Sequence, residues 1–119
     1  TGFSLLGHAW EMAQASRVGL RFEFGAIPLY HRVKELAEAW SFPGGGHNNA
    51  EYFGQHVQFA ASITKESQMV LFDPQTSGGL LFAIPQGQAA ACRQRAEKIG
   101  IPIWKVGTVT DSGLIEVAD

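Results

Sequence analysis

The sequence predicts a single α+β domain, an α/β sandwich in which helices pack against a mixed β-sheet. Segments with helical spacing of apolar residues alternate with segments of strand-like spacing along the 119 residues. Hydrophobic residues make up 45% and charged residues 17%, a composition that supports a buried core and argues against disorder. The apolar runs are only a few residues long, so no segment is expected to cross a bilayer.

Helices are expected where apolar residues recur every three to four positions. The segments with this spacing are residues 3–15, 29–40, 64–72 and 85–100. Gly7 is a poor helix former inside the first segment, which indicates close packing at that position. Thr64 is placed to cap the third helix, and Pro74 is placed to end it. We expect Ala89, Cys92, Ala96 and Ile99 to form the buried stripe of the fourth.

Strands are expected in the remaining apolar segments. Residues 18–24 alternate between apolar and polar side chains, and residues 55–60 form a shorter strand. Residues 80–84 are apolar throughout, which predicts a central strand that is covered on both faces. The turn signal Asp111-Ser112-Gly113 predicts a hairpin between residues 102–110 and residues 114–117.

Charge and cysteine content exclude several classes of function. Nine basic and eleven acidic residues give a formal net charge of −2, and no basic run is present to follow a nucleic-acid backbone or an anionic membrane. The single Cys92 forms no internal disulfide and makes no zinc site alone, which favours a reducing, cytoplasmic environment. We interpret Cys92 as a small core residue and not as a nucleophile.

The most tightly specified stretch is Asp73-Pro74-Gln75-Thr76-Ser77-Gly78-Gly79. Pro74 restricts the backbone on both sides of its nitrogen, while the two glycines permit conformations that a side chain would forbid. Residues 76–79 offer consecutive backbone N–H groups and two hydroxyls, which can form an anion-binding nest. A structural turn is favoured on local chemistry, because a phosphate-binding P-loop would carry a lysine and open a helix.

Two other features carry polar groups. Residues 41–49, Ser-Phe-Pro-Gly-Gly-Gly-His-Asn-Asn, are expected to form a loop, either open to a phosphate or, as we favour, a flexible linker. His8 lies on the polar face of the first helix, where no Asp, Glu or Cys is expected at ligand spacing beside it. We interpret His8 as structural or as a contact to a part of the protein outside this chain.

Three segments together resemble one family. Residues 1–8 resemble the T-G-F-G-L-L-G-H helix start of selenophosphate synthetase (selenide, water dikinase), a member of the aminoimidazole-ribonucleotide-synthetase-like superfamily. Pro43-Gly44-Gly45 with Asn49 resembles its P-G-G-T-x-x-N segment, and residues 73–81 match its D-P-Q-T-S-G-G-L-L. The chain departs from the family at Ser4, which replaces a glycine, at Gly46, which replaces a threonine, and at Asn48, where relatives are often basic.

The resemblance implies that residues 1–119 are one C-terminal domain, distantly ferredoxin-like, and a fragment that lacks the N-terminal half. The full-length enzyme would convert ATP, selenide and water to selenophosphate, AMP and phosphate with Mg²⁺, and it would be a homodimer. The nucleophilic Cys or selenocysteine, its Lys partner and most metal ligands would belong to the N-terminal domain, which would also be this domain's packing partner. No catalytic residue and no metal ligand is therefore expected here, and the fragment alone would be inactive.

The same resemblance implies which residues would contact phosphate or metal-bound water at the wall of the cleft. They are Thr1, Gly2, Asn49, Thr76, Ser77, Gly78 and Gly79. Two alternatives stay open. The chain could be the equivalent domain of aminoimidazole ribonucleotide synthetase, thiamine-monophosphate kinase or a hydrogenase-maturation protein, or it could be a non-catalytic packing and interaction module.

Overall fold

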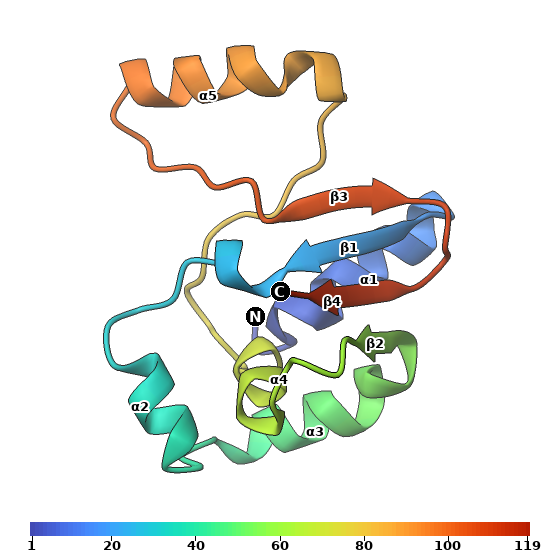
Figure 1. Ribbon diagram of the computed structural model, residues 1–119, viewed down its shortest axis with the longest axis vertical. Coiled ribbons are helices and arrows are strands. Elements are labelled where there is room, and N and C mark those ends of the chain that lie inside the picture. Colours follow the sequence, from blue (N-terminus) through green and yellow to red (C-terminus); the bar gives the residue numbers. More distant parts are fainter.

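A four-stranded sheet in the order β2-β4-β1-β3 forms one layer of the computed structural model, which describes all residues 1–119 (Figure 1). The strands are β1 (Gly19–Glu23), β2 (Val57–Phe59), β3 (Gly107–Thr110) and β4 (Ile115–Ala118). β1 pairs antiparallel with β3 and parallel with β4, and β4 pairs parallel with β2. The predicted α+β class with a mixed sheet is therefore confirmed.

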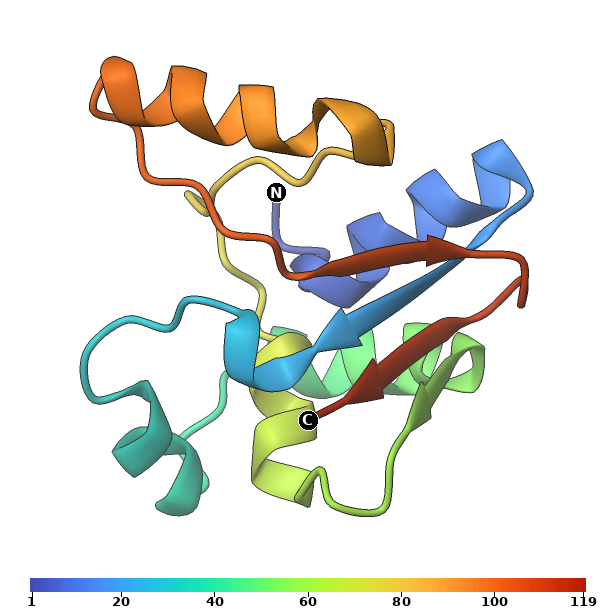
Figure 2. The same ribbon diagram turned by 45° about the horizontal axis from the view of Figure 1, so that its top comes forward.

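Helices cover one face of this sheet. The five α-helices of the chain are α1 (Ser4–Ser16), α2 (Val33–Glu38), α3 (Gly44–Phe53), α4 (Lys65–Leu71) and α5 (Ala89–Lys98), of which α1, α3 and α4 supply side chains to the core. Figure 2 shows α1 and α3 behind the strands, while α5 (orange) stands apart from the sheet at the end of two extended segments. None of these helices is long and apolar enough to cross a membrane.

The core lies between this sheet face and the helices. The alternation predicted for residues 18–24 is confirmed, because Leu20 and Phe22 are buried while Arg21 and Glu23 are exposed. Side chains of α1, α3 and α4 complete the cluster. The residues with the most deeply buried large side chains are Leu6, Ile115 and Val117. Since the opposite sheet face carries polar exposed side chains, the domain has two layers.

Close packing between α1 and α3 explains the glycine in the first helix. A Cβ atom at Gly7 would lie 2.7 Å from the ring of Phe53, closer than van der Waals contact allows. The prediction of close packing at Gly7 is confirmed. Glycine lowers helix propensity at this position, but it allows α1 and α3 to approach each other closely.

The predicted cap of α4 is also confirmed. The side chain of Thr64 accepts a hydrogen bond from the backbone nitrogen of Ser67 at 3.3 Å. Glu66 lies in the first turn of α4, where a hydrogen bond from the backbone, then one from the Thr64 side chain, lowers the pKa of its carboxyl.

The prediction of a central strand at residues 80–84 is wrong. This segment forms no helix or strand, its backbone has no hydrogen bond to other backbone groups, and Leu80 is 95% exposed. The strands β4 and β1 occupy the middle of the sheet. There, the buried residue Leu20 of β1 pairs with the buried residue Ile115 of β4. An apolar run indicates burial only if a sheet neighbour is available, and here the chain passes outside the sheet.

The buried stripe expected on the fourth helix is wrong as well. Residues 86–88 form a 3₁₀ turn ahead of α5, and only Ala96 on α5 is buried. Ile99 is exposed and Cys92 is half-buried, so Cys92 is not part of the core. α5 stands apart from the sheet (Figure 1), and most of its residues are exposed.

The segments from residue 29 to residue 49 differ from expectation. The second helix is shortened to the six residues of α2, because Arg32 at its start adopts a left-handed conformation with φ of 67°. The predicted loop at residues 41–49 is largely helical, since α3 begins at Gly44 directly after the extended Pro43. Tertiary packing of the glycines overrides their low helix propensity.

The predicted hairpin is also wrong. β1 lies between β3 and β4, so the two strands that flank Asp111-Ser112-Gly113 do not pair with each other. The turn itself is present, with Gly113 at φ of 71°. It carries the chain across the end of β1 instead of closing a two-stranded ribbon.

Candidate functional site

Asn49 connects two of the segments that the sequence singled out. It lies on α3 and is only 6% exposed. Its side-chain nitrogen donates one hydrogen bond to the carbonyl oxygen of Gly2 at 2.9 Å and another to the carbonyl oxygen of Phe72 at 3.1 Å. Both N–H groups of the amide are therefore used inside the protein. Asn49 holds the start of the chain against the residue that precedes Asp73.

The glycines before Asn49 allow α3 to approach the same turn. A Cβ atom at Gly45 would lie 3.2 Å from the ring of Pro74, and one at Gly46 would lie 3.7 Å from the carbonyl oxygen of Phe72. A side chain at Gly45 would require the Pro74 ring or α3 to shift by a few tenths of an ångström. The P-G-G segment thus packs on the turn, and its glycines serve close approach instead of forming a flexible linker.

Thr1 makes the third connection. Its backbone nitrogen donates a hydrogen bond to the carbonyl oxygen of Thr76 at 3.1 Å. The structure therefore brings together Thr1, Gly2, Asn49 and Thr76, which come from three separate parts of the sequence. Four of the seven residues expected at the site are linked by these hydrogen bonds.

The turn at residues 73–79 is exposed from Gln75 onward and holds few internal hydrogen bonds. Its one internal backbone bond runs from the nitrogen of Gln75 to the carbonyl oxygen of Asp73 at 2.8 Å. The backbone N–H groups of residues 76–79 have no partner within the protein, and Thr76, Ser77, Gly78 and Gly79 are all exposed. These N–H groups and two hydroxyls remain available to an incoming ligand.

For these residues the sequence favours a structural turn over an anion-binding nest. The backbone lacks the alternating right-handed and left-handed form of a nest, because none of the four residues 76–79 has a positive φ. Gly78 and Gly79 do not adopt the positive φ angles that favour glycine. A Cβ atom at Gly78 would lie 3.3 Å from the side chain of Gln75, while one at Gly79 would meet open space.

The backbone at Ser4 explains why the family that this chain resembles has glycine at this position. It is buried and adopts φ of 70°, a left-handed conformation that side chains disfavour. Its hydroxyl oxygen accepts a hydrogen bond from the backbone nitrogen of Gly7 at 3.1 Å. Ser4 therefore acts as a local cap of α1 in a backbone shape that suits glycine.

His8 has partners that the sequence reasoning missed. Its Nε2 atom contacts the hydroxyl oxygen of Thr1, and its Nδ1 atom lies 2.8 Å from a carboxylate oxygen of Glu11. The expectation that no carboxylate lies beside His8 is wrong, because the i,i+3 spacing places Glu11 on the same helical face. That spacing was the signal in the sequence that could have found the pair.

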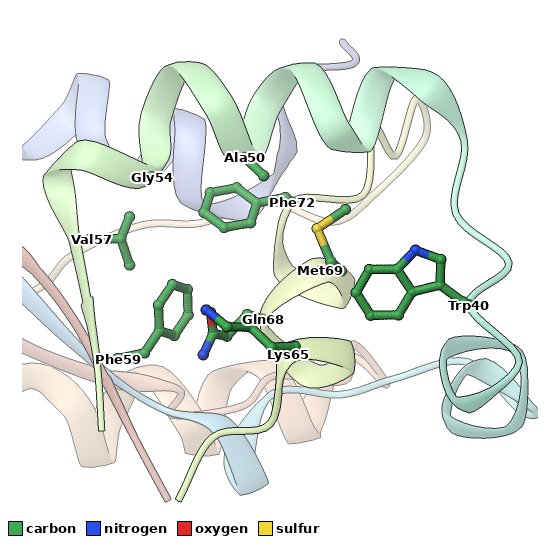
Figure 3. Close-up of a pocket in the computed structure, with 9 residues that line it drawn as sticks. All are labelled: Trp40, Ala50, Gly54, Val57, Phe59, Lys65, Gln68, Met69 and Phe72. Carbon is green, nitrogen blue, oxygen red and sulfur yellow. The ribbon is translucent and has the colours of Figure 1, made fainter. Parts of the chain in front are cut away.

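A separate cavity of about 410 Å³ lies between α3, β2 and α4, with Trp40 at its edge (Figure 3). Its walls are mostly apolar, and Lys65 donates a hydrogen bond to Gln68 at 3.3 Å within its lining. None of the seven residues expected at the site lines this cavity, although Phe72 does. The cavity and the cluster of sequence motifs are thus different places on the molecule.

The residues of this chain do not assemble a metal centre. No group of three or more His, Cys, Asp or Glu side chains lies close enough to hold a metal ion. Magnesium sites use carboxylate oxygens together with water or substrate phosphates.

Several relatives that share the name selenide, water dikinase match most of this chain. The selenide, water dikinase of Clostridium botulinum (strain Eklund 17B / Type B) is 37% identical over 113 residues, which are 95% of this chain and 33% of the relative. That of Pelobacter propionicus is 42% identical over 89 residues, which are 75% and 26%. That of Carboxydothermus hydrogenoformans is 36% identical over 116 residues, which are 92% and 32%.

The chain thus spans about a third or less of the length of these relatives. A family model described as AIR synthase related protein, C-terminal domain, matches residues 1–119, the whole of the chain. The α+β fold with its mixed sheet agrees with that match. The chain belongs to the family of AIR synthase related proteins as their C-terminal domain.

Proposed function

We propose that this chain is the C-terminal domain of an ATP-dependent selenophosphate synthetase, a phosphotransferase that converts ATP, selenide and water to selenophosphate, AMP and phosphate. In this proposal the domain forms a wall of the phosphate-transfer site and is inactive alone. The name shared by the relatives supports it. The observation that carries it is the meeting of three motif segments through Asn49 and Thr1.

The proposed contribution of the domain is positioning. Phosphoryl transfer depends mainly on the placement of the reacting groups and on electrostatic stabilisation by metal ions and hydrogen-bond donors. The unpartnered N–H groups and hydroxyls of residues 76–79 are donors of the required kind. Thr1 and Gly2 lie next to them, while Asn49 acts from behind by holding Gly2 in place.

ATP and Mg²⁺ would be held mainly by the rest of the full-length protein. The chain has no cluster of acidic side chains for the metal and no lysine in the turn at residues 73–79. The nucleophile and the metal ligands are therefore proposed to lie outside residues 1–119, in an N-terminal domain. No chemical step is assigned to this chain.

The proposed partner of the domain is that N-terminal domain. Exposed large apolar side chains occur on the extended segments around α5. They are Leu80, Phe82, Ile84, Ile99, Ile101 and Trp104. A concentration of exposed apolar residues is typical of a surface that contacts another domain. We further propose a homodimer of the full-length protein and a cytoplasmic location.

The test of the site uses the full-length protein with Thr76→Val and Ser77→Ala together. Loss of two hydroxyls that face solvent should lower selenophosphate synthesis at least tenfold and leave the melting temperature within a few degrees. A matched control combines Thr108→Val with Ser41→Ala, two exposed residues whose hydroxyls make no hydrogen bond. The control should keep full activity.

Two results would contradict the proposal. If the double variant loses activity and its melting temperature also falls by more than a few degrees, the turn is only structural, as expected for a packing module. Turnover of ATP to selenophosphate by purified residues 1–119 would show that the chemistry does not need another domain.

A further inference from the structure

Three side chains at the start of α1 are linked end to end. The hydroxyl oxygen of Thr1 contacts Nε2 of His8, and Nδ1 of the same ring lies 2.8 Å from a carboxylate oxygen of Glu11. The ring of Phe3 packs edge-on against the imidazole, with centroids 5.9 Å apart and planes at 77°. The His8 and Glu11 side chains are 42% and 56% exposed, so the chain of contacts lies at the surface.

The carboxylate of Glu11 fixes which atom donates in each of the two contacts of His8. An ionised carboxylate only accepts hydrogen bonds, so Glu11 places the proton of a neutral imidazole on Nδ1. Nε2 of His8 is then an acceptor, and the hydroxyl of Thr1 must donate to it. The proton of Thr1 is thereby committed inside the protein, while its oxygen keeps accepting capacity.

The committed proton limits what Thr1 can bind. A phosphate oxygen needs a hydrogen-bond donor, which this hydroxyl no longer offers. A water molecule can instead donate to the Thr1 oxygen, even though the Phe3 nitrogen also approaches that oxygen at 3.4 Å. The hydrogen bond from the Thr1 backbone to Thr76 places this oxygen beside the turn at residues 73–79.

We infer that His8 and Glu11 are positioning residues, which hold the Thr1 hydroxyl as an acceptor for a water molecule next to the turn and not as a donor to phosphate. This inference rests on the proposed function, because it specifies what one wall of that site binds. It assigns a role to a His and Glu pair that otherwise looks like a surface ion pair. Neither residue is expected to touch the reacting atoms.

The kinetic test uses the full-length protein and the variants Thr1→Val, His8→Phe and their combination. Phenylalanine keeps a ring against Phe3 and removes both hydrogen bonds of His8. Each single variant should lower kcat about fivefold, the effect of one hydrogen bond, with the KM for ATP within about twofold. Because His8 acts through Thr1, the double variant should be no slower than either single one.

Two further variants complete the design. Thr1→Ser keeps the hydroxyl and should restore kcat to within about twofold of the original protein. His31→Phe replaces another exposed histidine outside the site and should leave kcat unchanged. A double variant about 25-fold slower, or a fully active Thr1→Val protein beside a slow His8→Phe protein, would overturn the inference.

A second measurement does not depend on activity. Nitrogen NMR of the full-length protein labelled with ¹⁵N-histidine, at pH 8, should show the His8 proton on Nδ1, and Glu11→Ala should shift it toward Nε2. A proton on Nε2 in the unaltered protein would overturn the inference. An unaltered protein that makes no selenophosphate would instead refute the proposed function, and the position of the His8 proton would then decide the inference alone.

Discussion

Ser4 offers a prediction in which the usual ranking of helix residues is reversed. It is the first residue of α1, its φ is 70°, and its hydroxyl caps the nitrogen of Gly7 at 3.1 Å. In a helix interior, replacing alanine by glycine costs about 1 kcal/mol. At a left-handed position the side chain itself costs about 1–2 kcal/mol, which glycine avoids.

The expected free energies follow from these two effects and the cap. Ser4→Ala removes the capping oxygen and keeps the strained Cβ, so it should lower the free energy of unfolding by about 1 kcal/mol. Ser4→Gly also loses the cap but releases the strain, and the greater freedom of glycine in the unfolded chain offsets part of that gain. Its net cost should be only about 0.3 kcal/mol. Glycine should therefore melt about 3 °C above alanine.

The assay is thermal unfolding of the 119-residue chain followed by circular dichroism. Ala15→Gly in the exposed part of the same helix is the matched control, and it should lower stability by about 1 kcal/mol because its backbone is helical. If Ser4→Gly is less stable than Ser4→Ala by a similar amount, the backbone at residue 4 is helical and the argument from its positive φ fails.

Three other predictions concern stability. Gly7→Ala should lower the free energy of unfolding by about 2 kcal/mol, because its Cβ would meet the ring of Phe53, and Phe53→Leu should reduce that penalty; equal penalties in both backgrounds, measured by urea unfolding, would refute the contact. Asn49→Ala should cost about 1–3 kcal/mol, since the buried carbonyl group of Phe72 and the part-buried one of Gly2 lose their donor; an unchanged melting temperature would count against its clamping role. Thr64→Ala should cost about 1 kcal/mol at pH 7 and raise the pKa of Glu66 toward its ordinary value. A lowered carboxyl pKa stabilises the fold above the unfolded pKa and loses that effect as the pH falls through the folded one, so the stability difference should narrow in acid to the part that the cap itself contributes. An identical Glu66 titration by NMR in both proteins would contradict this.

Local patterns were reliable where neighbouring residues alone specify the structure. The first helix, the strand at residues 18–24 and the cap at Thr64 were all predicted and are confirmed. The spacing of Glu11 from His8 was a further local signal that went unused. The helix and the cap depend on residues within one or two turns of each other, and the alternation of residues 18–24 can be seen along the chain even though its partner strands are distant.

Patterns failed where a segment depends on distant neighbours. Residues 80–84 have the composition of a buried strand, yet they lie outside the sheet because β1 and β4 occupy its centre. The glycines at residues 44–46 indicate a loop, yet they start α3, and Gly45 there packs so closely on Pro74 that a Cβ atom would lie 3.2 Å from its ring. In both cases tertiary contacts override local preference.

The sequence by itself determined the α+β class, the family resemblance and the identity of the three motif segments. Those depend on residue types and on spacing along the chain, which are read directly. Only the tertiary structure decided the strand order, and that Asn49 and Thr1 bring the motifs together by hydrogen bonds to Gly2, Phe72 and Thr76. These contacts act over long range: strand pairing joins residues 95 positions apart, such as Leu20 and Ile115, and the hydrogen bond from Thr1 to Thr76 spans 75 positions. No periodicity along the chain encodes such partners.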